Sequence, residues 1–239
     1  MADGGKSSKG GTAEGPARHY HGHRERLRQR ILKDDGSALA DYELLELLLC
    51  AFIPRVDVKP IAKEMIERFG SVSAALGASP ERLMDVSGIG ETAAAYIRAT
   101  NLLLQATAGE QVKDRPVISN WGALLNYVSL KIKHEKTEQA RVLYLDRKNK
   151  LIADEKVGQG TVDHAPVYPR EIARRALELS ASAIILVHNH PSGDPTPSRA
   201  DIDLTRDIEK ALAPLEITVH DHLVVGAGET ISMKAKGLI

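Results

Sequence analysis

The sequence has one cysteine, no long apolar run and no net charge, and each of these absences excludes a class of protein. A single cysteine among 239 residues cannot form a disulfide framework, and this usage fits a reducing cytosol. No stretch reaches the roughly 18 apolar residues of a membrane span, and the N-terminus lacks the apolar core of a signal peptide. The formal net charge is +0, so no overall basic field indicates a nucleic-acid partner. We therefore expect a cytoplasmic protein with no membrane-spanning segment.

Patterning along the chain predicts two structured parts. Residues 1–17 are rich in Gly, Ser and Lys and have no periodic apolar pattern, so we interpret them as a disordered tail. Residues 18–106 carry successive amphipathic helical patterns and predict a small all-α domain. Residues 107–116 are polar and are interpreted as a linker. Residues 117–239 interleave apolar strands with helices, which indicates an α/β domain with a mixed sheet flanked by helices.

Helix boundaries in the first part follow from capping residues and glycines. We expect Asp41 to cap a helix over Tyr42–Phe52 and Gly70 to end the helix after it. A long helix is expected to begin at Glu91 and to end at about Ala106.

Gly88-Ile89-Gly90 separates two of these helical patterns. Two helices joined by Gly-apolar-Gly resemble a helix-hairpin-helix motif, in which backbone N–H groups and the second helix's N-terminus bind a DNA phosphate. The alternative is a tight turn between two packed helices. The spacing alone leaves both interpretations open.

Two histidines stand where a buried strand is expected to end. His188 and His190 follow the apolar run 183–187, and residues i and i+2 of an extended segment point to the same side. Asp201 returns from the first turn of the next helix. Two imidazole nitrogens and one carboxylate oxygen are a usual catalytic zinc set, with the fourth position left to water. We therefore predict Zn²⁺ at His188, His190 and Asp201.

The loop between these residues is expected to be stiff, because three prolines fix φ while Gly193 permits a reversal. The alternative is that Ser198 and Asp201 form only a capping box and that the histidines are turn residues. That alternative explains Ser198 and Asp201, but it leaves the His-x-His pair unexplained.

The spacing His-x-His, seven residues, Ser, two residues, Asp resembles the JAMM motif of the JAB/MPN metalloproteases. The longer string His-Asn-His-Pro-Ser-Gly-Asp-Pro-x-Pro-Ser-x-x-Asp, over 188–201, resembles the bacterial RadC family within that superfamily, and the resemblance extends over most of the chain. It implies a JAB/MPN-like metal-dependent hydrolase domain over 117–239. It also favours the presence of a helix-hairpin-helix-like motif in the first domain.

A hydrolase of this kind needs a carboxylate that takes a proton from the attacking water. Candidates near strands are Glu138, Glu155 and Glu171. In JAMM proteins the glutamate precedes a strand after the domain's first helix, and the resemblance assigns this role to Glu138. RadC sequences typically carry an aromatic residue where this chain has Ala140. The alternative for Glu138 is a solvated charge at a strand entry.

Two further residues have competing interpretations. Ser198 is expected to donate a hydrogen bond to the tetrahedral oxyanion, although the same hydroxyl is also expected to cap the helix. His222 lies in an apolar strand and is expected to be a hydrogen-bonded core residue or a partner of a ligand rather than a ligand itself.

Two functions follow as expectations. The first is a zinc-dependent metallopeptidase-like hydrolase of an unidentified peptide or protein substrate. The second is a DNA-binding repair accessory with a structural or vestigial metal site, since the family's name implies DNA repair. In that case Gly88, Ile89 and Gly90 would give weak DNA binding without sequence preference. The tripeptide His188-Asn189-His190 invites comparison with the HNH nucleases. A nuclease is disfavoured, because in those enzymes the three residues are scattered through a ββα-metal motif and are not adjacent.

Overall fold

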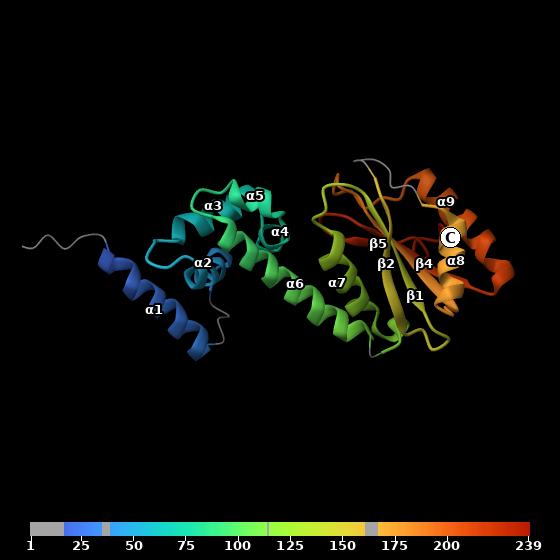
Figure 1. Cartoon of the computed structure of the whole chain (residues 1–239), viewed down its shortest axis with the longest axis horizontal. Helices are drawn as coiled ribbons and strands as arrows, with labels where there is room; N and C mark the ends of the chain where they lie inside the picture. The colour runs from blue at the N-terminus through green and yellow to red at the C-terminus, as the bar shows by residue number, and fades with distance from the viewer. Residues whose placement is uncertain (1–16, 35–38, 114, 161–166) are drawn as a thin grey trace, which may run out of the picture. The chain divides into compact units, whose positions relative to one another are not determined.

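The computed structural model describes residues 17–34, 39–113, 115–160 and 167–239, whose helices and strands appear in Figure 1. The expected tail, residues 1–17, lies outside the described residues except for Ala17, which begins a helix. The chain forms two compact units, which divide between Arg98 and Ala99. Among the described helices, none is long and apolar enough to cross a membrane.

The described part of the first unit is built of helices. They are α1 (Ala17–Asp34), α2 (Asp41–Phe52), α3 (Lys59–Phe69), α4 (Val72–Gly77), α5 (Pro80–Met84) and the first part of α6 (Glu91–Lys113). Leu49, Met65, Leu83 and Ile97 come from four of these helices and are fully buried together. The helices therefore share one hydrophobic core.

The boundaries of α2 and α3 test the predicted caps. Ala40, rather than Asp41, is the N-cap of α2, and the Glu43 side chain accepts a hydrogen bond from the Ala40 N–H at 2.9 Å. Asp41 stands instead at the first helical position, where the positive end of the helix dipole stabilises its negative charge. Gly70 caps α3 in the left-handed conformation with φ of 84°, as predicted.

Helix α6 is longer than expected. It continues to Lys113 instead of ending near Ala106, so the prediction of a linker over 107–116 is wrong for 107–113. Ala108 and Val112 stand four residues apart on one helix face and are buried in a hydrophobic cluster of the second unit. A polar composition does not end a helix when the apolar residues of one face are buried.

The second unit contains a five-stranded mixed sheet flanked by helices, as predicted, with strand order β2-β1-β3-β4-β5. Its elements after α6 are η1 (Val117–Asn120), α7 (Trp121–Ile132), β1 (Gln139–Leu145), β2 (Leu151–Gln159), α8 (Pro169–Glu178), β3 (Ala183–Asn189), α9 (Arg199–Leu212), η2 (Ala213–Leu215), β4 (Thr218–Val225) and β5 (Thr230–Ser232). Strands β3 and β4 are parallel, and the other neighbours are antiparallel. Helix α9 provides the crossover that a parallel pair requires.

Helix α7 covers one face of the sheet, and α8 and α9 cover the other (Figure 1). Successive strand residues alternate between these faces, so Ile185 joins the α7 cluster and Leu186 joins the α8–α9 cluster. His188 has the same parity as Leu186 and therefore faces α9. Ala140 of β1 lies directly opposite His188 in the antiparallel register. The end of β3 thus presents its side chains to the first turns of α9.

Candidate metal centre

His188, His190 and Asp201 come together where β3 ends and α9 begins. One ligand atom from each residue lies within 4.8 Å of the other two. The two histidine Nε2 atoms are 2.9 Å apart and lie 3.5 and 3.7 Å from the Oδ1 and Oδ2 atoms of Asp201, respectively. Two nitrogens bound to one tetrahedral zinc ion at about 2.0 to 2.1 Å stand about 3.3 Å apart. The predicted ligand set is therefore assembled at a spacing that suits one metal ion.

Backbone contacts bring His190 to this point. Its N–H donates to the carbonyl of Val225 at 3.0 Å, and Gly193 reverses the chain with φ of 91°. The Gly193 carbonyl accepts a hydrogen bond from Ala227 N–H at 2.9 Å, and a Cβ added at Gly226 would meet that oxygen at 2.6 Å. Gly226 therefore lets the loop lie directly on the turn between β4 and β5.

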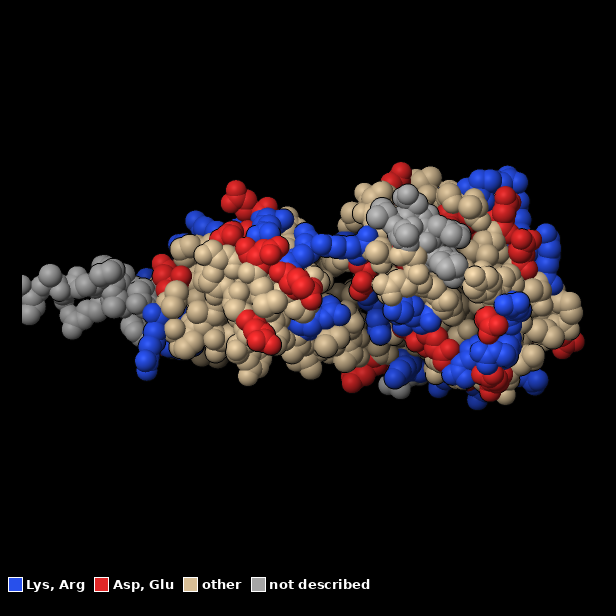
Figure 2. All heavy atoms as spheres, turned by 45° about the horizontal axis from the view of Figure 1, so that its top comes forward, with Lys and Arg blue, Asp and Glu red and all other residues tan. Residues whose placement is uncertain are grey.

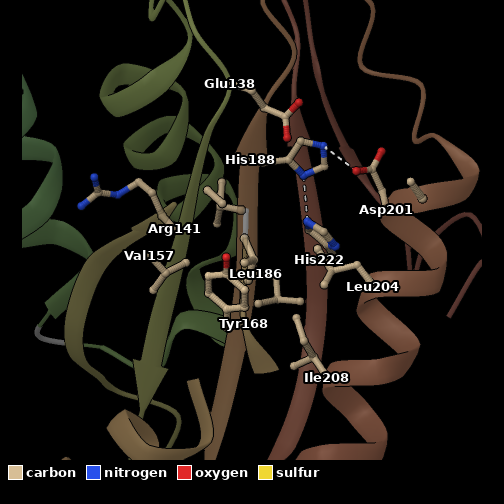
Figure 3. A pocket seen from close by; sticks show the side chains of 14 residues that line it. Glu138, Arg141, Val157, Tyr168, Leu186, His188, Asp201, Leu204, Ile208 and His222 are labelled. Carbon is tan, nitrogen blue, oxygen red and sulfur yellow. Dashed lines mark hydrogen bonds and ion pairs between the residues drawn. The ribbon is translucent and has the colours of Figure 1, made fainter. Parts of the chain in front are cut away.

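A buried hydrogen-bond chain fixes the tautomer of His188. Thr205 donates its hydroxyl proton to the Asp201 backbone carbonyl at 2.6 Å, so His222 Nδ1, also 2.6 Å from that hydroxyl, must carry its own proton. Burial lowers the pKa of His222 well below its ordinary value, so the ring is neutral and Nε2 is an acceptor. This Nε2 accepts from His188 Nδ1 at 2.8 Å. The Nε2 of His188 therefore carries no proton, and it points toward Asp201 (Figure 3).

His190 presents the same nitrogen to the centre. Its Nδ1 lies 2.7 Å from the carbonyl of Asp194, which can only accept, so Nδ1 carries the proton. In their neutral forms the two rings direct Nε2 lone pairs at one point beside a carboxylate. These lone pairs repel one another unless a proton or a metal ion lies between them. The donor set fits a divalent cation that takes nitrogen and oxygen ligands.

Burial and neighbouring charge determine how these groups ionise. Burial lowers the pKa of His188 to about 4, so this ring is neutral at neutral pH. The Asp201 carboxylate, 3.7 Å from Nε2, stabilises the protonated ring and raises the pKa of His190, although partial burial opposes it. Burial acts to raise the pKa of Asp201, but the His190 ring and the hydrogen bonds donated by the Ser198 hydroxyl and N–H hold it well below its usual range. The carboxylate is thus ionised and attracts a cation.

Glu138 lies at the same end of the site, immediately before β1. It lines a cavity together with His188 and Asp201, and Figure 3 shows its carboxylate beside the His188 ring. Its negative charge contributes to the raised pKa of His190. Glu138 therefore lies beside the residues that are predicted to bind the metal.

The two rival carboxylates are engaged elsewhere. Arg175 binds the Glu155 carboxylate at 2.6 and 2.9 Å, and this hydrogen bonding lowers the pKa of Glu155. Glu171 is exposed and pairs with Arg174 at 3.2 Å. Neither lines the cavity that contains Glu138. The geometry thus favours Glu138, and its role as general base stays a prediction.

Asn189, between the two histidines, fastens the segment that carries Glu138. Its amide nitrogen donates to the carbonyls of Glu135 and Thr137 at 3.3 and 3.2 Å, and its Oδ1 accepts from Gln139 N–H at 2.9 Å. The side chain is 1% exposed, so these bonds replace the water that a buried amide would lose. Sequence reasoning missed this residue.

Ser198 is committed to the helix cap. Its hydroxyl accepts from Asp201 N–H at 3.2 Å and donates to Asp201 Oδ2 at 2.7 Å, while Ser198 N–H donates to the same oxygen at 2.7 Å. The capping box and the ligand set therefore coexist. A hydroxyl has one proton, so donation to an oxyanion requires the Ser198 side chain to turn. That catalytic role stays a prediction.

Gly88, Ile89 and Gly90 form the turn between α5 and α6. Gly88 has φ of 88°, and a Cβ there would meet Cδ1 of Ile61 at 2.7 Å. Ile89 is buried in the core of the first unit, whereas both glycines are exposed. Figure 2 shows Lys and Arg interspersed with Asp and Glu on the visible face. The turn's shape suits either interpretation, and DNA binding stays a prediction.

Comparison with known proteins defines the class. Residues 118–238 match the RadC-like JAB domain, and residues 21–95 match the family described as UPF0758 N-terminal. The sheet and the His-His-Asp group are thus those of a JAB-domain protein of the JAMM superfamily. The chain belongs to the RadC family.

Two similar proteins bear the name UPF0758 protein. The one from Rhodobacter capsulatus is 53% identical over 213 residues, which cover 89% of this chain and 100% of that protein. The one from Ruegeria pomeroyi is 52% identical over 217 residues, which cover 91% of this chain and 97% of that protein. The similarity therefore includes both units.

Proposed function

We propose that the second unit is a zinc-dependent hydrolase of the JAMM type that cleaves a peptide or isopeptide bond. The observation that best supports this proposal is that the Nε2 atoms of His188 and His190 and the carboxylate of Asp201 lie close to one point. His188, His190 and Asp201 would hold the ion, and two imidazoles in the set favour zinc over magnesium or calcium. Zinc supplies a Lewis acid that polarises an amide carbonyl and activates water.

Two other side chains complete the proposed chemistry. Glu138 takes a proton from the attacking water and delivers it to the leaving amine. Asn189 keeps the Glu138 segment against β3. Ser198 turns its hydroxyl toward the substrate carbonyl as negative charge develops on the oxygen. We place the activity in the cytoplasm, because the chain's single cysteine fits a reducing compartment.

The test is to incubate the zinc-loaded protein with a library of peptides and to identify the products by mass spectrometry. We expect cleavage of a subset of sequences, loss of cleavage after chelation, and its return when zinc is added back. Cleavage that persists at full rate in chelated, zinc-free protein would contradict the proposal.

A second candidate function is weak binding of DNA by the first unit, as an accessory to repair. It is supported by the exposed glycines of the turn before the 23-residue helix α6, because backbone N–H groups at a helix N-terminus favour phosphate. Glu91 opens that helix with an exposed carboxylate, which repels phosphate. This candidate therefore ranks second.

A further inference from the structure

A cavity of about 330 Å³ runs from the candidate metal centre along the face of the sheet that α9 covers (Figure 3). Glu138, His188 and Asp201 lie at one end of it. Most of the remaining lining is apolar, including Leu186, Leu204 and Ile208. The cavity is thus polar where the reaction would occur and apolar away from it.

The register of β1 and β3 places a small side chain next to the cavity. Ala140 lies opposite His188, and side chains of opposite residues begin about 4.5 to 5.5 Å apart. Because alanine ends at Cβ, the space beside the His188 ring is left unfilled by β1. Leu186, two residues before His188, faces the same side and is 4% exposed. These residues form the sheet side of the cavity.

Helix α9 forms the opposite side. Leu204 and Ile208 follow Asp201 by three and seven residues and so lie on the same helix face as this ligand. Ile208 is fully buried and Leu204 is half-buried, and both side chains line the cavity. A group that reaches past His188 would therefore meet hydrocarbon on both sides.

The residues that line the cavity favour an apolar group over a charged one. Arg141 borders the cavity, but its Nε is bound to Asp154 at 2.7 Å, so its charge is already engaged. A charged side chain at the apolar end would lose water without a partner, which is costly. An apolar cavity of about 150 Å³ already accepts benzene, so this one has room for a phenyl ring and its methylene stem.

We propose that this cavity receives a large apolar side chain, aromatic or leucine-like, of the substrate residue next to the bond that is cleaved. The proposal rests on the proposed hydrolase function for the reaction, but the cavity's preference for apolar groups does not depend on the metal. Ala140 and Leu204 are then the residues that determine specificity, because they border the passage between the metal ligands and Ile208.

The test uses two hydroxamates that share one metal-binding group, acetohydroxamate and 3-phenylpropanohydroxamate. Their dissociation constants for the zinc-loaded full chain are measured by calorimetry. We expect the phenyl compound to bind about 10- to 100-fold more tightly, the range for burying a side chain of that size. Ala140→Phe and Leu204→Trp fill the cavity from opposite sides, and each should reduce the preference below about 3-fold while acetohydroxamate affinity is unchanged.

Leu177→Trp is the matched control, because Leu177 is 55% exposed on α8 and lies outside the cavity. This variant should keep the full preference. Equal affinity of the wild type for both compounds would overturn the proposal. Survival of the preference in both filled variants would overturn it as well.

Failure of the metal site would be recognised separately. If the wild type retains no zinc, the proposed hydrolase function fails, and toluene is then titrated into metal-free protein while methyl NMR signals of Leu204 and Ile208 are followed. Shifts that disappear in Ala140→Phe would support the apolar cavity. The absence of shifts in the wild type would overturn the proposal on its own.

Discussion

Two turns in this protein, one in each unit, contain a glycine in the same left-handed conformation but differ in the side chains around it. Gly193 precedes α9 and Gly88 precedes α6, with φ of 91° and 88°. At the first turn, side chains of β3 and α9 converge on one point. At the second, Ile89 turns into the core between two exposed glycines. A glycine turn before a helix thus supplies a shape, and the residues beside it supply the chemistry.

The difference follows from what comes before each turn. A strand end presents residues i and i+2 to one side, so the His188 and His190 rings meet, whereas the turn before α6 follows a five-residue helix. Neighbouring strands also add second partners, such as His222 from β4. The two turns should therefore respond very differently to substitution.

The largest effect is expected from His188→Ala combined with His190→Ala. This change removes both nitrogen ligands, so zinc should fall from about one ion per chain to less than about a tenth of that. Elemental analysis after dialysis measures it. His220→Ala is the control, because His220 hydrogen-bonds Asn149 at 2.6 Å, outside the ligand group. Undiminished zinc in the double variant would place the metal elsewhere.

Glu138→Gln separates the base from the ligands. It keeps the shape of the side chain and removes its basicity, so turnover of any peptide found should fall about 100-fold or more while zinc content stays at the wild-type level. Asp201→Asn should instead weaken zinc binding, because an anionic ligand is lost. Loss of zinc in Glu138→Gln would show that Glu138 is itself a ligand.

Thr205→Val tests the buried hydrogen-bond chain. Without the hydroxyl, His222 Nδ1 loses its acceptor and no longer fixes the tautomer of His188, so zinc affinity should fall about 10-fold. Competition with a chromogenic chelator measures the change. Thr218→Val, at an exposed position of β4, provides the matched substitution and should bind zinc normally. Equal zinc affinities of the Thr205→Val and Thr218→Val variants would show that Thr205 does not position the His188 ring.

The smallest effect is expected at the other turn. Gly90→Val places its side chain where a Cβ meets no atom within 4 Å, so the fold should be kept while the N–H groups are shielded. Weak DNA binding, measured by fluorescence anisotropy at low salt, should fall a few-fold, and wild-type binding should weaken steeply as salt rises. Gly122→Val, equally open at Cβ, is the control. Identical binding by all three proteins would show that the hairpin is only a turn.

The sequence predicted the residues that are close along the chain and missed those joined only by the fold. The His-x-His pair, the return of Asp201 and the mixed sheet follow from strand and helix periodicity. The partners of His222 and Asn189 are separated from them by 17 to 54 positions, and no local pattern marks such contacts.

Helix ends were predicted less well for a related reason. The predicted N-cap of α2, Asp41, lies one position after the actual N-cap, Ala40, because the Glu43 side chain caps the Ala40 N–H from within the helix. The length of α6 depends on burial of Ala108 and Val112 against residues far along the chain. Local composition carries no information on either contact.

The parallel pairing of β3 with β4 also determines when the proposed metal site can form. All three ligands and His222 come from the β3–α9–β4 crossover. A nascent chain in which α9 has not yet docked offers only two neighbouring imidazoles, which hold zinc much less firmly than three ligands do. Pairing of distant strands is the slow, non-local step of folding. If the proposed site binds zinc, metal uptake during refolding would report when this crossover closes, after more local structure has formed.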